Sequence, residues 1–295
     1  MTFEQIRTLC AIVEEGGFRP AAERLHKSQS SLSYAIRQLE DEFKLRVFSR
    51  ESYRPELTDA GRALYERAKG LLQNVAEFED LGRQLSQGVE AEVDLALSAL
   101  TPLPPLIPVL REFAKRFPHT RLRMSVEIFG ALEKVRDGRA QLAITEGRDL
   151  DPGQFEVEPH CPIKLIPVVA PSHPLGRRQK EISQSMLMNF PHLILRSTGS
   201  VDGRSSAGIM EGAFTWSLPD FQTKMTLLKA GLGWGHMPHH LVEKEIRAKV
   251  LVKLKVPEFK GLEENQWVVR RRGQNTGLAQ AYLWRELTKV AKRKI

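Results

Sequence analysis

The segment AAERLHKSQSSLSYAIRQLEDEF, residues 21–43, contains a row of side chains suited to hydrogen bonding. Gln29, Ser33 and Arg37 are spaced at i, i+4 and i+8, so a helix would present all three on one face. The short serines beside them add little bulk, so this face could approach another polar surface closely and bind it through donors and acceptors. The polar residues that we expect to form this surface are Ser28, Gln29, Ser30, Ser33, Tyr34 and Arg37.

The opposite face of the same segment is apolar. Leu32, Ile36 and Leu39 recur at helical spacing, which predicts a helix that packs these side chains into a core. Residues 20–25 predict a short preceding helix with a proline in its first turn, and Ser28 is suited to cap the second helix. Two short helices with so brief a link are typical of the helix-turn-helix, whose second helix enters the DNA major groove.

A basic turn is expected after the second helix. The apolar residues at 45–48 are followed by Arg50 and Arg54, a pattern that predicts a two-stranded wing. Arginines in a wing would contact backbone phosphates, which hold the register without reading bases. The alternative is that the helix pair is ordinary solvated surface and serves only as scaffold.

Composition limits the class of protein. The net charge is +8, but residues 1–60 hold nine Lys and Arg against ten Asp and Glu, so the DNA prediction depends on where charges lie. No apolar run approaches the roughly 18 residues of a membrane helix, and the N-terminus lacks the apolar segment of a signal peptide. We therefore expect a cytoplasmic protein. Cys10 and Cys161 match no metal-binding spacing, and Cys10 is most simply a core residue.

Residues 58–87 predict one long helix, with Thr58 suited as its N-cap. Apolar and small residues recur at alternating steps of four and three, a heptad seam that favours pairing with a second helix. We therefore expect a dimer rather than a helix packed only on its own domain. Two recognition helices in a dimer would bind an interrupted palindrome. The seam residues are Leu64, Ala68, Leu71, Val75, Phe78, Gly82 and Leu85.

From residue 93 onward the pattern changes to strands alternating with helices, which implies parallel α/β subdomains. The predicted strands include 93–99, 121–126, 141–144 and 192–196, and the predicted helices include 106–117, 132–138 and 220–231.

Residues 3–72 resemble the winged helix-turn-helix of LysR-type transcriptional regulators. The similarity is carried by AAERLHKSQSSLSYAIRQLEDEFKLRVFSR followed by LTDAGRALYERAKGLL, and it extends more loosely along the remaining chain. One departure is that Arg19 and Pro20 stand where the family usually has Ser or Thr before the first Ala of AAE. The resemblance implies a transcriptional regulator that binds double-stranded DNA and assembles into dimers and tetramers.

The resemblance also implies an α+β domain organisation. A winged helix-turn-helix DNA-binding domain would occupy residues 1–58, a dimerising linker helix 59–88 and an effector domain 91–295. The effector domain would be an α/β module like periplasmic binding proteins, holding a small molecule between two subdomains. Subdomain I would comprise 91–162 plus 268–295, and subdomain II 163–267.

Short hydroxyl side chains mark the expected ligand site. Ser98 and Thr101 follow the first predicted strand, and Ser197 and Thr198 follow another, at positions where open α/β sheets bind small anions. These segments resemble the ligand-contact segments of LysR-type proteins, and nearby Arg196 favours an anionic effector. Aromatic side chains are secondary candidates, with core packing as the alternative for each. They are Phe129, Phe221 and Trp234.

Motifs for other chemistry are weak. GLGWG lacks the spacing of a dinucleotide-binding loop, and His236, His239 and His240 have no carboxylate or cysteine nearby in sequence to complete a metal site. No G-x-S-x-G and no phosphate-binding loop ending in Lys is present. We expect no enzyme activity, cofactor or metal. The alternative function is a dimeric small-molecule binding protein or enzyme without specific DNA binding.

Overall fold

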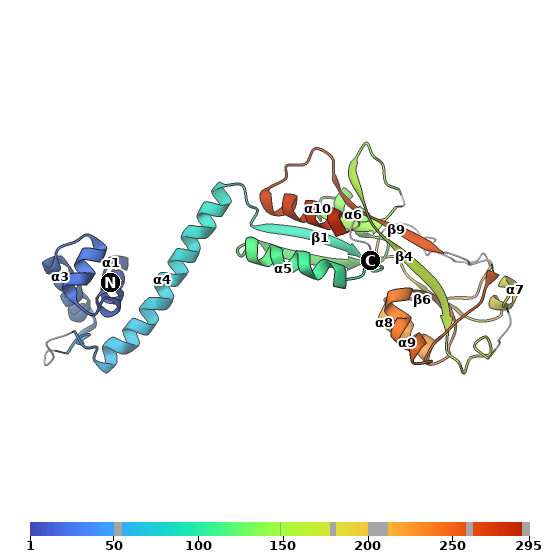
Figure 1. Ribbon diagram of the computed structural model, residues 1–295, viewed down its shortest axis with the longest axis horizontal. Helices are drawn as coiled ribbons and strands as arrows, with labels where there is room; N and C mark the ends of the chain where they lie inside the picture. The colour runs from blue at the N-terminus through green and yellow to red at the C-terminus, as the bar shows by residue number, and fades with distance from the viewer. Residues whose placement is uncertain (50–54, 148, 178–180, 200–211, 258–261, 291–295) are drawn as a thin grey trace. The chain divides into compact units, whose positions relative to one another are not determined.

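The computed structural model describes residues 1–49, 55–147, 149–177, 181–199, 212–257 and 262–290 (Figure 1). The chain divides into two compact units, Met1–Gln87 and Gly88–Ile295. Within the described residues, no helix is both long and apolar enough to cross a membrane.

The first unit is helical. Thr2 begins it with a capping box, in which its hydroxyl accepts from the Gln5 amide and the Gln5 side chain accepts from the Thr2 amide. Pro20 is the third residue of its helix, where a missing N–H still leaves no helical bond unmade. The helices are α1 (Phe3–Glu14), α2 (Phe18–Leu25), α3 (Gln29–Phe43) and α4 (Asp59–Ser86).

The predicted apolar stripe of α3 is confirmed as core. Leu32, Ile36 and Leu39 are 1%, 4% and 2% exposed, and they pack with side chains of α1 and α2. Burial of this stripe fixes which face of α3 remains outside, because side chains at helical spacing cannot turn independently.

Helix α4 packs into the core of the first unit along its first half, with Leu64, Ala68 and Leu72 in that core. The Thr58 hydroxyl caps it by accepting from the Gly61 amide at 2.9 Å. Gly61 lies directly against the Val47 carbonyl, where an added Cβ would come within 2.1 Å of the oxygen. Farther along, the predicted seam is exposed: Leu71, Phe78 and Leu85 are 46%, 75% and 46% exposed. The predicted long helix is therefore confirmed, and it carries exposed apolar side chains from Leu71 onward.

The second unit is built on a mixed sheet with the strand order β2-β1-β3-β9-β4-β7, and β8 also pairs with β4. The predicted parallel pairing is present, since β1 runs parallel to both β2 and β3. The long β4 and β9 pair antiparallel to one another, with β9 also antiparallel to β3. The strands are β1 (Glu92–Ser98), β2 (Arg121–Glu127), β3 (Leu142–Glu146), β4 (Phe155–Val169), β7 (Gly235–Pro238), β8 (Val252–Lys253) and β9 (Glu263–Arg271).

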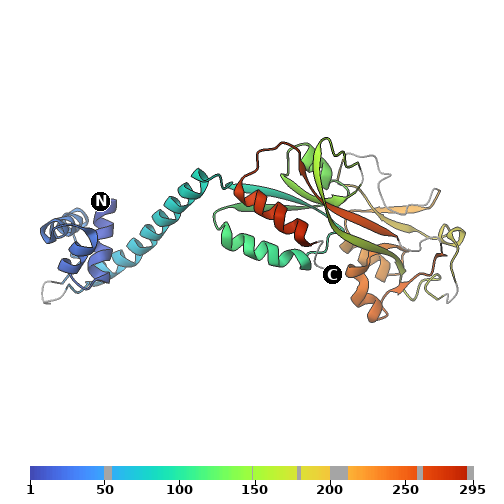
Figure 2. The same cartoon turned by 45° about the horizontal axis from the view of Figure 1, so that its top comes forward.

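Helices cover both faces of the part of the sheet formed by β1, β3 and β9. α5 (Ile107–Arg116) and α10 (Leu278–Val290) lie side by side on one face (Figures 1 and 2), where Phe113, Phe117 and Tyr282 pack together. α6 (Ala131–Arg136) contacts the other face. A 3₁₀ turn at Pro104–Leu106 precedes α5.

A second core lies around the other end of β4. There β5 (His192–Leu195) and β6 (Thr215–Leu218) form a parallel pair, and α8 (Phe221–Lys229) and α9 (His239–Arg247) pack nearby. The short α7 (Gln184–Leu187) belongs to a neighbouring apolar cluster. Helix α8 was predicted from the sequence, whereas α9 and α10 were not.

Candidate nucleic-acid interface and ligand site

The turn between α2 and α3 sets the placement of the polar face. His26 ends α2 in the left-handed region, with φ 52°, and its amide and that of Lys27 bond back to carbonyls of α2. Ser28 then caps α3 by accepting from the Ser31 amide at 3.2 Å. Ala21 and Ala22 are buried, so small side chains let α2 pack closely against its neighbours. The predicted pair of helices with a brief link is therefore present.

Five of the six side chains predicted for the polar surface of α3 and its cap are exposed. Ser33 is half-buried, Tyr34 is 61% exposed, and its hydroxyl accepts from Gln38 at 2.7 Å. The exposed members are Ser28, Gln29, Ser30, Tyr34 and Arg37.

The basic side chains of the first unit differ in whether a carboxylate binds them. Arg24 pairs with Glu14 and Glu15, and Arg46 pairs with Glu40. Within the part of the chain that the structure describes, no carboxylate forms an ion pair with Arg37, so its guanidinium is available to a phosphate or a base.

The basic residues on either side of α3 differ in what the structure describes. Lys27, in the turn before α3, forms an ion pair with Glu4 of α1 at 2.6 Å. Arg50 and Arg54, the predicted wing arginines, lie outside the described residues. The segments leading into the turn are antiparallel, with a bridge between Phe48 and Leu57.

Glu40 anchors this segment, a role that the sequence analysis missed. Its carboxylate is buried at the end of the apolar stripe of α3 and accepts from the Val47 and Phe48 amides at 2.7 and 3.4 Å. It also pairs with Arg46 at 2.8 Å. Glu40 stands four residues after Ile36, in line with the apolar stripe, and a carboxylate in a core is unusual unless it has such partners. Its position in line with the apolar stripe was the sequence signal that could have predicted its burial.

In the second unit, the predicted hydroxyl groups are held by protein partners. Ser98 donates to the Glu146 carboxylate, and Thr101 accepts from Gln266 at 3.0 Å. Both hydroxyls are buried. The Ser98 hydroxyl therefore already donates its one proton to a carboxylate and is not available to donate it to an anion.

The second pair of predicted hydroxyls ties two loops together. The Ser197 hydroxyl donates to the Ile128 carbonyl at 3.2 Å, and the Thr198 hydroxyl donates to Glu127 at 2.8 Å and accepts from the Ile128 amide at 3.0 Å. These bonds join the segment after β5 to the end of β2. Arg196, which directly precedes them, is exposed.

The aromatic candidates have different surroundings. Phe129 and Phe221 are half-buried and line a small cavity of about 30 Å³. Trp234 is 0% exposed, stacks on His192 at 4.0 Å between centroids, and donates its indole N–H to the Leu187 carbonyl. Its placement is that of a core residue, and we leave it out of the ligand site.

The cavity brings together basic groups that the sequence analysis did not select. Lys224, His192 and His236 line it with Leu100, Phe129, Leu165, Leu195 and Phe221. Burial lowers the pKa of Lys224 to about 7 and the pKa values of both histidines to about 3. Lys224 and Leu228 stand at i and i+4 and are both buried, so helical spacing was the signal for an inward lysine.

The three histidines considered as metal ligands do not converge. His236 is buried, whereas His239 and His240 are exposed at the start of α9. Within the described ranges, no group of three His, Cys, Asp or Glu side chains is placed to hold a metal ion.

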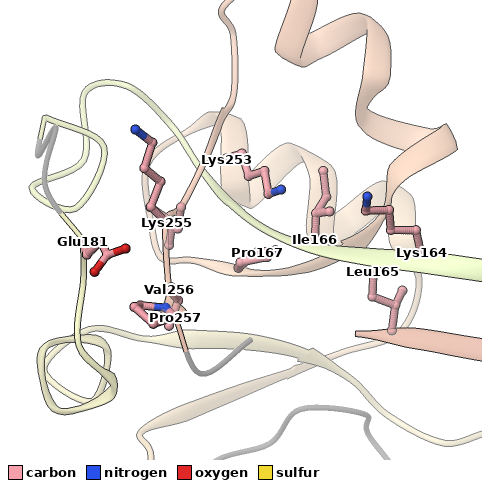
Figure 3. A pocket seen from close by; sticks show the side chains of 10 residues that line it. Lys164, Leu165, Ile166, Pro167, Glu181, Lys253, Lys255, Val256 and Pro257 are labelled. Carbon is pink, nitrogen blue, oxygen red and sulfur yellow. The ribbon is translucent and has the colours of Figure 1, made fainter. Parts of the chain in front are cut away.

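A larger groove of about 320 Å³ lies along β4 and β8 (Figure 3). Its charged side chains, Lys164, Lys253, Lys255 and Glu181, are exposed, and it includes none of the residues predicted for the ligand site. We interpret it as solvated surface.

An exposed polar face on α3 in one unit and an α/β unit with an internal cavity are typical of a DNA-binding regulator with a ligand-binding module. The family comparisons agree with this class. The bacterial regulatory helix-turn-helix of the lysR family matches residues 3–62, and the LysR substrate binding domain matches residues 86–292. The chain belongs to the LysR family of transcriptional regulators and is not an enzyme.

Relatives extend over nearly the full chain. It is 26% identical to the probable HTH-type transcriptional regulator YhaJ of Escherichia coli, covering 98% of this chain and 97% of that protein. It is 28% identical to the HTH-type transcriptional activator AllS of Salmonella typhimurium, covering 87% and 84%. Among solved structures, CrgA, a LysR-type regulator from Neisseria meningitidis, has a TM-score of 0.52 at 19% identity, covering 98% of this chain and 99% of that one.

Proposed function

We propose that α3 reads the operator through the stripe of Gln29, Ser33 and Arg37. Amide and guanidinium groups can form paired hydrogen bonds with base edges in the major groove. Ser28, Ser30 and Tyr34 lie beside the stripe and would contact the DNA backbone or the base edges. The wing residues Arg50 and Arg54 would contact phosphates. The observation that carries the proposal is this outward polar stripe opposite the buried stripe of Leu32, Ile36 and Leu39.

We further propose that α4 forms the dimer. It exposes Leu71, Phe78 and Leu85, and apolar side chains at heptad spacing are stabilised by a second helix. A two-fold dimer would present two recognition helices, so its operator would be an interrupted palindrome. Strand β2 lies at the edge of the sheet and exposes Met124 and Val126, which supports a second self-contact that assembles dimers into tetramers.

The effector would bind inside the second unit and act on DNA binding in the cytoplasm. Phe129 and Phe221 supply apolar walls for a small molecule. A ligand can change operator binding only if it binds one arrangement of the subunits more tightly than the other. We also propose that the domain limits expected from the sequence hold, with the effector domain at residues 91–295.

A gel-shift comparison tests the recognition surface. The probes are DNA from upstream of the protein's own gene and a shuffled duplex of equal length. Gln29→Ala should reduce the preference for the upstream probe by roughly tenfold or more, while Gln73→Ala, an exposed glutamine on α4, should leave it unchanged. If both variants keep the preference, α3 does not read the operator. Uniform weak binding by the unaltered protein would favour a ligand-binding protein without specific DNA binding.

A further inference from the structure

Lys224 carries a buried amine in the second unit. It is 4% exposed, and its end lies against the backbone of β7, where a Cβ added to Gly235 would come within 3.3 Å of Nζ. Within the described part of the chain, no carboxylate forms an ion pair with it. Lysine is rarely buried unless paired, because desolvation of an ammonium is costly. This position therefore needs an explanation beyond packing.

The described side chains that line the cavity around Lys224 include basic groups but no acid. The cavity receives Lys224 from α8, His192 from β5 and His236 from β7. Its apolar and aromatic side chains come from β4, β5, α8 and the loops after β1 and β2. The His192 Nδ1 atom is buried and has no hydrogen-bond partner among the described residues. A cavity with an amine, two imidazoles and apolar walls is complementary to an anion that carries an apolar body.

We propose that this cavity binds the carboxylate of a small ligand with an apolar body, with the Lys224 ammonium as counter-ion and His192 as hydrogen-bond partner. The inference rests on the proposed function, in which a small effector binds in this unit. It places the anion at Lys224 and away from Ser98 and Thr198, whose hydroxyls donate to carboxylates. A space of about 30 Å³ accommodates the head of such a ligand, and its body would extend past the half-buried rings of Phe129 and Phe221.

The lowered pKa of Lys224 provides a signature of this arrangement. With its pKa at about 7, the amine is largely neutral at pH 8. A bound carboxylate favours the ammonium form and raises that pKa, so binding should take up about one proton per site. The histidines, with pKa values of about 3, remain neutral at this pH and contribute no proton uptake.

Calorimetric titration of the full-length protein at pH 8 tests the proposal. The probes are straight-chain monocarboxylates from acetate to octanoate and the primary alcohols of matching length, in two buffers of different ionisation enthalpy. We expect at least one carboxylate to bind with uptake of about one proton, and its matched alcohol to bind roughly tenfold or more weakly. Failure of the whole carboxylate series, or equal binding of acid and alcohol, would overturn the proposal.

Two lysine variants test whether Lys224 is responsible for carboxylate binding and proton uptake. Lys224→Met should weaken carboxylate binding by about tenfold or more and abolish the proton uptake, and Lys229→Met, which removes an exposed lysine of the same helix, should change neither. Unchanged binding by Lys224→Met would contradict the inference. Should Lys224→Met fail to fold, judged by its melting transition, the acid and alcohol comparison on the unaltered protein decides the matter alone.

Operator footprinting separates this inference from the proposed function. If the unaltered protein, Lys224→Met and Lys229→Met protect the same operator and no carboxylate binds, the assignment of α3 as the DNA-reading helix stands and the carboxylate site is wrong. If carboxylates bind at Lys224 and no operator is protected, the carboxylate site stands and the proposed DNA recognition is wrong.

Discussion

At the scale of single residues, the two faces of α3 should respond differently to the same truncation. Leu32 is 1% exposed, so Leu32→Ala should lower the free energy of unfolding by about 2 to 5 kcal/mol, since it leaves a cavity. Gln29 is exposed, and Gln29→Ala should change stability by less than about 0.5 kcal/mol. Urea denaturation of the two variants measures both values, and equal losses would contradict the assignment of faces.

Glu40 provides a second residue-level test. Glu40→Ala would leave the buried Val47 and Phe48 amides without their acceptor, which should cost about 1 to 3 kcal/mol. Glu40→Gln keeps an acceptor oxygen and should cost clearly less, because the lost ion pair involves the half-exposed Arg46. Urea denaturation midpoints should therefore rank the unaltered protein, the Gln variant and the Ala variant in that order. A Gln variant as unstable as the Ala variant would show that the charge matters more than the hydrogen bonds.

The buried His236 makes stability depend on pH. Burial lowers its folded-state pKa from 6.5 to about 3, so its contribution is complete above pH 6.5 and is lost as pH falls toward 3. Between pH 7 and pH 5, the stability of the unaltered protein relative to His236→Gln should fall by about 2 kcal/mol, because only the unfolded histidine takes up a proton. Denaturation of both proteins at the two pH values measures this difference. A constant difference would mean that the folded histidine also becomes protonated.

At the scale of elements, the exposed seam of α4 should decide self-association. Leu71→Glu combined with Phe78→Glu places charge on two side chains that are 46% and 75% exposed, so the fold of the unit should survive while helix pairing is lost. Sedimentation should show a smaller species than the unaltered protein, with helical content retained. Glu77→Gln, on the same helix, is the control and should sediment normally. Unchanged sedimentation of the double variant would exclude α4 as the dimer contact.

Periodic elements could be predicted from the sequence, and long-range pairings could not. The stripe of Leu32, Ile36 and Leu39 and the cap at Thr58 are local signals, so α3 and α4 follow from neighbouring residues alone. The pairing of β4 with β9 joins segments about a hundred residues apart, and no local pattern encodes that partner.

The ligand cavity shows the same limit. Its walls come from several separate segments, so the sequence identified Phe129 and Phe221 by type but could not reveal that Lys224 and His192 meet them. A tryptophan can stack on a ligand or pack in a core, so residue type alone does not decide the role of Trp234. Its complete burial identifies it as a core residue.

At the scale of the whole molecule, recognition of DNA by α3 is the central claim. The direct measurement is footprinting of the DNA upstream of the protein's own gene across a salt series, with the unaltered protein, Arg37→Ala and Arg83→Ala. Both variants lose one exposed positive charge, but Arg83 lies at the far end of α4. We predict that the unaltered protein and Arg83→Ala protect an interrupted palindrome and that Arg37→Ala does not. A plot of log affinity against log salt concentration should fall with a slope of about 0.9 for each phosphate contact. Weak protection without sequence preference, the same in all three proteins, would contradict the account.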